Sequence, residues 1–421
     1  MSGDTLSPTS GERIDTLDFI RGVAVMGIVL ANIAAFGQPF SAAFYPKAFI
    51  TPDAAWDQWA WLAQLVLIDG KLRGLFTLLF GAGLVLFMER ASAKGAGSSL
   101  QLRRLFWLLC FGALHFVLLW QGDILMFYAL TGVAALPFLG WSGRRLLLVG
   151  LGGYIAGALL LSLLYGFPAL VAREEMAGDP VLGAQRTQIA AAQAVALAQE
   201  MREAAIIVGG DYLGFVRNNL IDLPGQVGFD IILTFAETLP LVLLGMGLFR
   251  LGLFTDGWPQ RKLVWWSIAG IVAGGAATLA LGLREVERGV TYYGAIWTIM
   301  GISMLPRLPM ILGLAGLLTV LAPAVSQSFG ARVRAAGRMA FSNYLGTSFV
   351  MLWVFHGFGL GLFGQLNRLE LYGVALGSAA LMLLWSKPWL DRFRYGPLEW
   401  LWRCLTYGRR FPLRRESARG G

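Results

Sequence analysis

Charged side chains are scarce in this chain. Asp, Glu, Lys and Arg make up 14% of its 421 residues and hydrophobic types make up 57%, whereas a soluble globular domain has about 25% charged and about 45–50% apolar residues. This shortage excludes water as the main solvent of the fold. Apolar runs recur along most of the sequence, and runs of about 18 residues or more are long enough to cross a hydrocarbon core of about 30 Å.

Cysteine and histidine are also rare, with two copies of each. Cys110 and Cys404 stand near opposite ends of the chain and show neither metal-ligand spacing nor a disulfide framework, so we expect no metal. A phosphate-binding loop is missing as well. The glycines at 74, 81 and 83 are not followed by a Lys-Ser or Lys-Thr pair, and they are typical of ordinary helix packing.

The apolar runs predict helices rather than barrel strands. A backbone in lipid must satisfy its own hydrogen bonds, which leaves helices or a closed barrel. The runs are continuous and rich in Leu, Ala and Gly, whereas barrel strands would alternate, and the 54 glycines fit close helix contacts. We therefore expect an all-α, polytopic membrane bundle of about ten transmembrane helices, at residues 16–36, 73–90, 102–120, 123–141, 146–167, 228–250, 262–282, 296–321, 339–362 and 371–387.

Four regions follow from this pattern. Residues 1–12 are small and polar and are expected to be disordered; residues 13–169 form an N-terminal transmembrane half, whose first run we interpret as a retained signal anchor. Residues 170–226 form an extracytoplasmic insert, helical at 183–205. Residues 227–421 form a C-terminal transmembrane half with a basic tail.

The basic residues predict the orientation. Lys and Arg gather in alternate loops, for example at Arg103 and Arg104, at Arg144 and Arg145, and in the tail from Lys387. With ten helices, all basic loops lie on one side, which by the positive-inside rule is the cytoplasm. Both termini are then cytoplasmic, and the net charge of +9 reflects these loops rather than nucleic-acid binding.

Ionisable side chains inside apolar runs are candidate functional residues, because burying them in lipid is costly. His115 lies toward the outer end of the third helix, and Asp123 follows eight residues later. Such a pair could act as a general base, although a structural His bonded to a carbonyl is an alternative of equal weight. His356, near the outer end of the ninth helix, is more simply an interfacial residue.

Other polar residues within the apolar runs indicate a cavity lined by polar side chains. Arg21 and Asn32 recur on one face of the first helix, about 16 Å apart along its axis. A capping or snorkelling role for Arg21 beside Asp18 is the alternative. Glu237 and Arg307 fall deep in the sixth and eighth helices, where they could pair with each other or Arg307 could bind a phosphate.

Long stretches of the chain resemble the YeiB family of bacterial inner-membrane proteins, whose C-terminal half is a recognised domain of unknown function. The resemblance runs from about residue 12 to 415 and rests on ERIDTLDFIRGVAVMGIVLANIAAFG, KLRGLFTLLFGAG, RRLFWLLCFGALHFVLLWQGDILMFYAL, GRMAFSNYLGTSFV and FRYGPLEWLWRCLTYGRRFPLRR. The opening LDFIRG at residues 17–22 is also similar to the wider transmembrane acyltransferases. Those enzymes use cytoplasmic acyl-CoA, an acceptor across the membrane and a catalytic histidine.

The resemblance implies a bacterial inner-membrane acyltransferase that moves an acyl group from acyl-CoA, in the first place acetyl-CoA, to a hydroxyl or amine. The acceptor would be a sugar or lipid headgroup at the periplasmic face. Asn32 stands about where sugar O-acetyltransferases have a histidine, and an amide could orient a substrate or stabilise an oxyanion but cannot act as a base. The expected residues are therefore His115, Asp123 and Asn32 for catalysis, Arg21, Arg73, Arg307 and Arg338 for the acyl-CoA phosphates, and His356, Asp69 and Glu237 for the acceptor.

Two other functions remain open from the sequence. A small-solute transporter would also use the polar face of the first helix, with a gate at each end of the membrane. Inverted repeats are the usual signature of such transporters, and none is evident here. A membrane scaffold would bind a partner through the insert at 170–226. The expected partners are the lipid bilayer and the acceptor, with a homodimer left open.

Overall fold

The computed structural model describes residues 14–415 except 53–55, 94, 96, 174–181, 223, 256 and 326, with the side chains of 222–232 and 234 also left out. The disordered segment predicted at 1–12 lies outside this range. The described residues form helices and loops, with one isolated antiparallel bridge between Phe393 and Arg414.

Helices account for nearly all regular structure in the described residues. The α-helices are α1 (Asp15–Gly37), α2 (Asp57–Leu67), α3 (Lys71–Ser92), α4 (Ser98–Leu118), α5 (Leu125–Ala135), α6 (Gly143–Val171), α7 (Gly183–Val208), α8 (Tyr212–Arg217), α9 (Pro224–Arg250), α10 (Gln260–Glu287), α11 (Tyr292–Trp297), α12 (Met304–Ala324), α13 (Gln327–Arg338), α14 (Ala340–Phe355), α15 (Arg368–Arg392) and α16 (Pro397–Tyr407). Short 3-10 turns are η1 (Phe40–Ala43), η2 (Pro46–Ala48) and η3 (Leu136–Gly140), and π-helical turns are η5 (Asn218–Asp222) and η6 (Thr298–Ile302).

Many of these helices suit a membrane. In the described part of the chain, seven segments are long and apolar enough to cross one, and two shorter apolar helices, Leu125–Gly140 and Ala340–Phe355, accompany them. Large apolar side chains such as Leu163 and Trp266 are about three-quarters exposed, which lipid explains and water would not. The all-α fold and the multi-pass membrane character are confirmed; the count of ten and the orientation stay predictions.

Each predicted span overlaps a helix, but some boundaries differ. The span predicted at 296–321 is divided into α11, η6 and α12. Pro306 lies in the first turn of α12, where a proline is tolerated because the amide that it lacks has no partner within the helix. The span predicted at 339–362 ends at Phe355. His356 is extended, and Gly357 meets the Val208 carbonyl so closely that a Cβ there would lie 2.1 Å from its oxygen. The chain therefore turns where it touches α7.

The segment between the spans predicted at 296–321 and 339–362 contains a helix, α13, which packs along α1. A Cβ at Gly337 would lie 1.8 Å from the Asp18 carbonyl oxygen, and one at Gly22 would lie 2.1 Å from that of Val333. Only glycine allows so close a crossing, as at other membrane helix contacts. This contact holds Arg338 beside the first helix.

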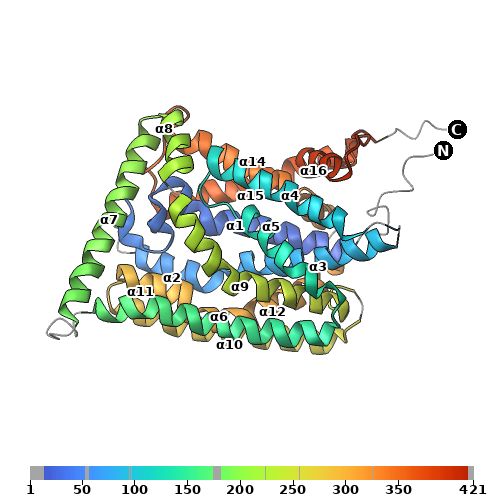
Figure 1. The fold of residues 1–421 in the computed structure, drawn as a ribbon, viewed down its shortest axis with the longest axis horizontal. Coiled ribbons are helices and arrows are strands. Elements are labelled where there is room, and N and C mark those ends of the chain that lie inside the picture. The colour runs from blue at the N-terminus through green and yellow to red at the C-terminus, as the bar shows by residue number, and fades with distance from the viewer. Residues whose placement is uncertain are drawn as a thin grey trace.

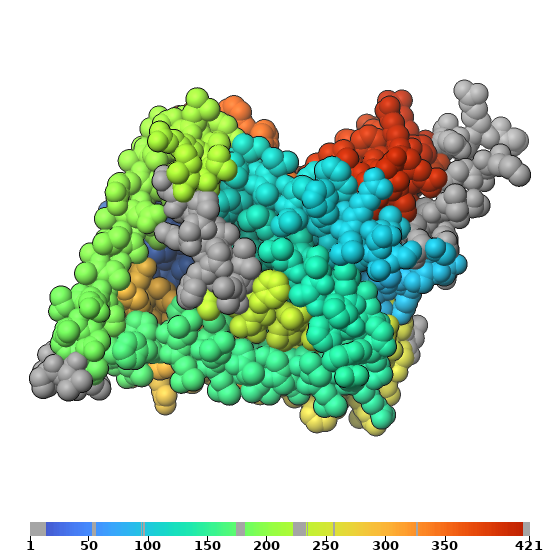
Figure 2. Space-filling model, in the orientation of Figure 1, coloured from blue at the N-terminus to red at the C-terminus, as the bar shows by residue number. Residues whose placement is uncertain are grey.

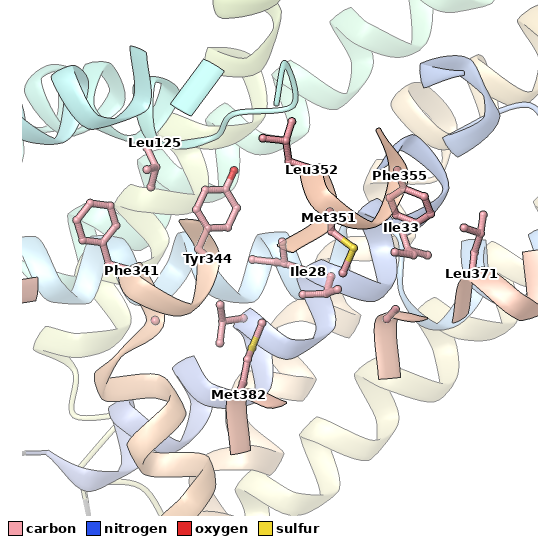
Figure 3. Close-up of a cluster of buried hydrophobic side chains, with 14 of the residues drawn as sticks. Ile28, Ile33, Leu125, Phe341, Tyr344, Met351, Leu352, Phe355, Leu371 and Met382 are labelled. Carbon is pink, nitrogen blue, oxygen red and sulfur yellow. The ribbon is translucent and has the colours of Figure 1, made fainter. Parts of the chain in front are cut away.

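The bundle has two different ends (Figure 1). At one end α7 lies across the direction of α6 and α10, and at the other end lies α16. The largest buried apolar cluster joins α1, α4, α5, α14 and α15, and Figure 3 shows Phe341, Tyr344 and Leu352 of α14 within it. This cluster surrounds the candidate site.

Candidate active site

His115 is bonded through both of its ring nitrogens. Nδ1 lies 2.8 Å from Asp123 Oδ1, and Nε2 lies 2.8 Å from the Oγ atom of Ser348. The side chains of His115 and Asp123 have no exposed surface, and Ser348 is 1% exposed. A carboxylate thus orients the imidazole, and the imidazole faces a hydroxyl, which is the arrangement of an activated nucleophile.

Local backbone features hold Asp123 in place. α4 ends at Leu118, and the chain returns to α5 through a short loop that contains Asp123. The second carboxylate oxygen, Oδ2, accepts the amide of Met126 at 2.7 Å in the first turn of α5. Gly112, one turn before His115, makes room for this carboxylate, because a Cβ there would lie 2.8 Å from Oδ2.

α14 supplies Tyr344 and Ser348, which share one face because they are four residues apart. The Tyr344 hydroxyl accepts the Ile124 amide at 3.3 Å and donates weakly to the Gly122 carbonyl at 3.4 Å. In Figure 3 this hydroxyl points away from the α14 ribbon. Neither residue was predicted from the sequence; their spacing of four positions within GRMAFSNYLGTSFV was the available signal.

Two connected pockets lead from the α16 end toward His115. The first, called the basic pocket, is lined by Arg21, Arg90, Arg104, Arg338 and Arg403, with Asp18, Glu399 and several aromatic rings. The second, the apolar pocket, shares Arg21, Arg104, Arg338, Glu399 and Trp402 with the first. Its remaining walls are mainly apolar and include Ile124, Leu125 and Tyr344. The two pockets therefore join a cluster of arginines to residues beside the Asp123–His115 pair.

A third pocket lies on the other side of Asp123. This aromatic pocket is lined by Phe40, Phe44, Tyr45, Phe127, Tyr165 and Tyr292, together with Gln121, Gly122, Asp123, Ser41, Glu200, Arg73, Glu237 and Arg307. In Figure 2 a recess opens beside α7, and orange atoms in the position of α11 are visible through it. Asp123 thus borders the aromatic pocket, while its neighbour Ile124 borders the apolar pocket.

Glu237 binds two arginines at the wall of the aromatic pocket. Its carboxylate accepts Arg73 at one oxygen and Arg307, at 3.3 Å, at the other. The Arg307 side chain is 2% exposed and also donates to Ser303 Oγ at 3.0 Å. Its guanidinium packs on Gly70, whose φ of 72° and lack of a side chain leave the space. The pairing of Glu237 with Arg307 considered from the sequence is therefore present.

Asp69 belongs to a separate buried cluster. Its Oδ1 accepts the Gln64 amide at 2.9 Å, and the Gln64 carbonyl accepts Arg368 at 3.2 Å and the Tyr372 hydroxyl at 2.6 Å. Lys71, fully buried, donates to the Leu65 carbonyl. These groups tie α2, α3 and α15 together.

α7 contacts residues of the aromatic pocket through two glutamates, of which Glu200 itself lines the pocket. Glu200 accepts the Ser41 hydroxyl at 2.5 Å and its amide at 3.0 Å, and Glu203 accepts the Gln121 side chain at 2.9 Å. Burial raises the pKa of the Glu203 carboxyl from 4.5 to about 7 and also raises that of Glu200. His356 lines a smaller pocket under the same helix with both glutamates.

The raised pKa of Glu203 predicts a stability that depends on pH. Because this pKa is higher in the folded than in the unfolded chain, its contribution is complete below about pH 4.5 and is lost as the pH rises through about 7. We expect the unfolding temperature to fall between pH 5 and 8, by the equivalent of up to about 3 kcal/mol at about 1.4 kcal/mol per unit of pKa. Differential scanning fluorimetry in detergent measures it.

Two variants check the assignment to this carboxyl. Glu203→Gln cannot ionise and is expected to flatten the fall, whereas Glu287→Gln, at an exposed position on α10, keeps it. A fall as steep in Glu203→Gln as in the wild type would contradict the prediction.

The structure brings some predicted site residues together and separates others. His115 and Asp123 are in contact, while Asn32 is half-buried on α1 and takes no part in the hydrogen bonds described for His115. Arg21 and Arg338 share the basic pocket, but Arg73 and Arg307 line the aromatic pocket with Glu237. Arg90, Arg104 and Arg403 join the basic pocket, which the sequence analysis did not predict.

The side chains of Asp123, His115 and Ser348 are of the types that carry out acid–base and nucleophilic chemistry. In the described part of the chain no three His, Cys, Asp or Glu side chains gather in a way that would hold a metal ion. The basic pocket is the part that suits a multiply charged anion, because its arginine side chains outnumber its carboxylates.

Comparison with known proteins gives the family. Residues 248–409 match the family described as "Protein of unknown function (DUF418)". The chain is 31% identical to "Uncharacterized protein YxaH" of Bacillus subtilis (strain 168), over 96% of each chain, and 31% identical to "Uncharacterized protein YeiB" of Escherichia coli (strain K12), over 94% of this chain and 96% of the relative. An "Uncharacterized 39.9 kDa protein in amylase 3'region" of Bacillus acidopullulyticus is 25% identical over 96% of each chain. No solved structure matches. With similarity along nearly its whole length, this chain belongs to the DUF418 family of proteins that includes YeiB and YxaH.

Proposed function

We propose that this protein is a membrane acyltransferase that moves an acyl group from cytoplasmic acyl-CoA to a hydroxyl or amine acceptor on the opposite side of the membrane. The observation that carries the proposal is the position of the Asp123–His115 pair. It stands between the apolar pocket, which begins at an arginine cluster, and the aromatic pocket beside α7.

The basic pocket supports the donor side. The phosphates of acyl-CoA carry several negative charges, and guanidinium groups bind them with charge-assisted hydrogen bonds. Arg104 lies over the rings of Trp402 and Phe87, at 4.6 and 4.7 Å from their centroids, so that aromatic surface lies next to the charge. His115 follows Arg104 by eleven positions on α4, a rise of about 16 Å. Leu108, between them on the same helix, lines the apolar pocket, which suits the apolar acyl-bearing arm of the donor.

The groups around His115 supply the chemistry. The imidazole acts as general base, and Asp123 holds its orientation and stabilises the charge that it gains. Tyr344 lines the apolar pocket, and its hydroxyl donates only a weak hydrogen bond, to the Gly122 carbonyl. In this proposal the hydroxyl donates instead to the oxyanion that forms on the thioester carbonyl.

The aromatic pocket supports a sugar or polar headgroup as acceptor. Six aromatic rings offer flat apolar faces, and Ser41, Gln121 and Glu200 offer hydrogen-bonding groups at its walls. This combination of apolar surface with a few placed polar groups is typical of small-molecule sites.

The proposal includes a topology of ten spans in a bacterial inner membrane, with both termini in the cytoplasm and α7 outside. It is tested with the exposed positions Ala191 on α7 and Arg410 near the C-terminus. In a chain whose Cys110 and Cys404 are replaced by Ser, Ala191→Cys should react with an impermeant maleimide in intact spheroplasts. Arg410→Cys should react only after lysis, and the reverse pattern would overturn the orientation.

Calorimetry with acetyl-, succinyl- and longer acyl-CoA tests the donor directly. We expect saturable binding that weakens at least about tenfold in Arg21→Ala and Arg338→Ala, because each removes a charge-assisted hydrogen bond of about 1.5–3 kcal/mol. Arg144→Ala, at an exposed position at the start of α6, is the matched control and should bind normally.

A small-solute transporter is the second candidate, supported by the buried cluster of Asp69, Lys71 and Arg368. Ionisable groups at such depth often mark a transport pathway. If no acyl-CoA binds, and proteoliposomes show counterflow of a solute without covalent change, the transporter replaces the acyltransferase.

A further inference from the structure

Ser348 completes a Ser–His–Asp arrangement that the sequence did not indicate. Its Oγ atom lies 2.8 Å from His115 Nε2, while His115 Nδ1 lies 2.8 Å from Asp123 Oδ1. The three residues come from α14, α4 and the loop before α5. A hydroxyl, a base and an orienting carboxylate in hydrogen-bond contact are the signature of nucleophilic catalysis on any fold.

The position of Ser348 along α14 fits this role. Phe341 and Tyr344, up to two turns before it, line the apolar pocket, and Met351 and Leu352, one turn after it, line the pocket under α7. Ser348 thus lies between the pocket that begins at the arginines and a pocket at the α7 end.

The bonds of His115 also favour a serine over direct transfer. Nδ1 is occupied by Asp123, so Nε2 is the nitrogen that can take a proton, and Nε2 faces Ser348. A base aimed at a hydroxyl of the protein activates that hydroxyl first.

We infer that Ser348 is the activated nucleophile of a Ser348–His115–Asp123 triad and that it carries the acyl group as a serine ester between donor and acceptor. The acyl-carrying step rests on the proposed function. In the first half-reaction His115 Nε2 takes the Ser348 proton as Oγ attacks the thioester carbonyl. The C–S bond then breaks, and the thiolate of CoA receives that proton and leaves as the thiol.

In the second half-reaction the acceptor attacks the serine ester. His115 Nε2 takes the proton of the acceptor hydroxyl or amine as its oxygen or nitrogen bonds to the acyl carbon. The bond between that carbon and Ser348 Oγ breaks, and Oγ regains the proton. No net oxidation occurs, and the near-complete burial of Ser348 protects the ester from water between the steps.

The first test uses the full-length protein purified in detergent and radiolabelled acetyl-CoA without acceptor. We expect one acetyl group per chain on Ser348, located by peptide mass spectrometry. Ser348→Ala should take no label and should transfer on the order of 10³-fold more slowly. Thr347→Ala is the matched control, because Thr347 carries a buried hydroxyl on the same helix and donates it to the Asn343 carbonyl at 2.8 Å.

Three results would separate the inference from the function on which it rests. Full transfer by Ser348→Ala, or an acetyl group found on His115, would overturn the serine ester and leave the acyltransferase intact. Absence of transfer and of label with every acyl-CoA would overturn the proposed function.

A fluorophosphonate probe decides the nucleophile without any acyl donor. Ser348 Oγ should bond to its phosphorus with loss of fluoride, in the wild type and in Thr347→Ala. The reaction should be lost in Ser348→Ala and reduced on the order of 10³-fold in His115→Gln. No reaction at Ser348 in the wild type would overturn the triad.

Discussion

Replacing His115 with glutamine is expected to lower acyl transfer on the order of 10³-fold, within the range that a positioned general base contributes. The substitution removes the imidazole, which takes the proton of Ser348 and is oriented by Asp123. It changes no residue of the basic pocket. Acyl-CoA binding should therefore stay within about twofold of the wild type, which separates chemistry from donor binding.

Transfer and binding are measured on the same preparations, by release of free CoA and by calorimetry. Leu114→Ala is the matched control, since Leu114 precedes His115 on α4 and is 56% exposed, toward lipid in the proposed topology. Asp123→Asn should also slow transfer, because an amide cannot stabilise the charged imidazole. Normal transfer by folded His115→Gln that still binds acyl-CoA would refute this mechanism.

The candidate site was predictable from the sequence where a rare residue type stood in an unusual place. His115 and Asp123 are ionisable groups close together at the end of an apolar run, and the cost of burying them pointed to a role. Glu237 and Arg307 were found by the same reasoning, and they are indeed paired.

Ser348 could not be found in that way. A serine within an apolar helix is ordinary, because its hydroxyl can bond the carbonyl one turn back at little cost. Its role depends on a contact between residues 233 positions apart, and only the packing of α14 against α4 creates it.

The basic pocket was missed for a different reason. Arg90, Arg104 and Arg403 stand next to apolar runs or in the tail, where the positive-inside rule already accounts for them. Their convergence requires α16 to fold back onto α4, where the Trp402 indole donates to the Arg104 carbonyl at 2.9 Å. Glu399 adds a second link, because its carboxylate accepts the Phe341 and Ser342 amides and caps α14 from another helix.

Replacing Glu237 with glutamine is expected to destabilise the fold by about 3–5 kcal/mol, because removing one partner of a buried ion pair leaves an uncompensated charge. Arg307 is 2% exposed, so its guanidinium cannot turn to water, whereas Arg73 is 31% exposed and can recover part of its solvation. Thermal unfolding in detergent measures the loss. Glu89→Gln, at an exposed position on α3, is the control and should unfold as the wild type does.

A double substitution shows whether the charge itself is responsible. Arg307→Met combined with Glu237→Gln leaves Arg73, which is partly exposed, as the remaining cation of the group. It should therefore be more stable than Glu237→Gln alone, and the cycle of single and double variants gives the coupling energy. If Glu237→Gln unfolds at the wild-type temperature, the carboxylate does not hold this wall together.

The same variants distinguish a structural Glu237 from one that binds the acceptor. If its carboxylate only holds the two arginines, the double variant should recover stability and acceptor KM together, because the wall of the aromatic pocket is restored. If the carboxylate also contacts the acceptor, stability should recover while the acceptor KM stays raised, since the lost contact cannot be replaced by removing Arg307. The acceptor-binding role expected for Glu237 from the sequence thus has its own measurement, independent of the stability of the pair.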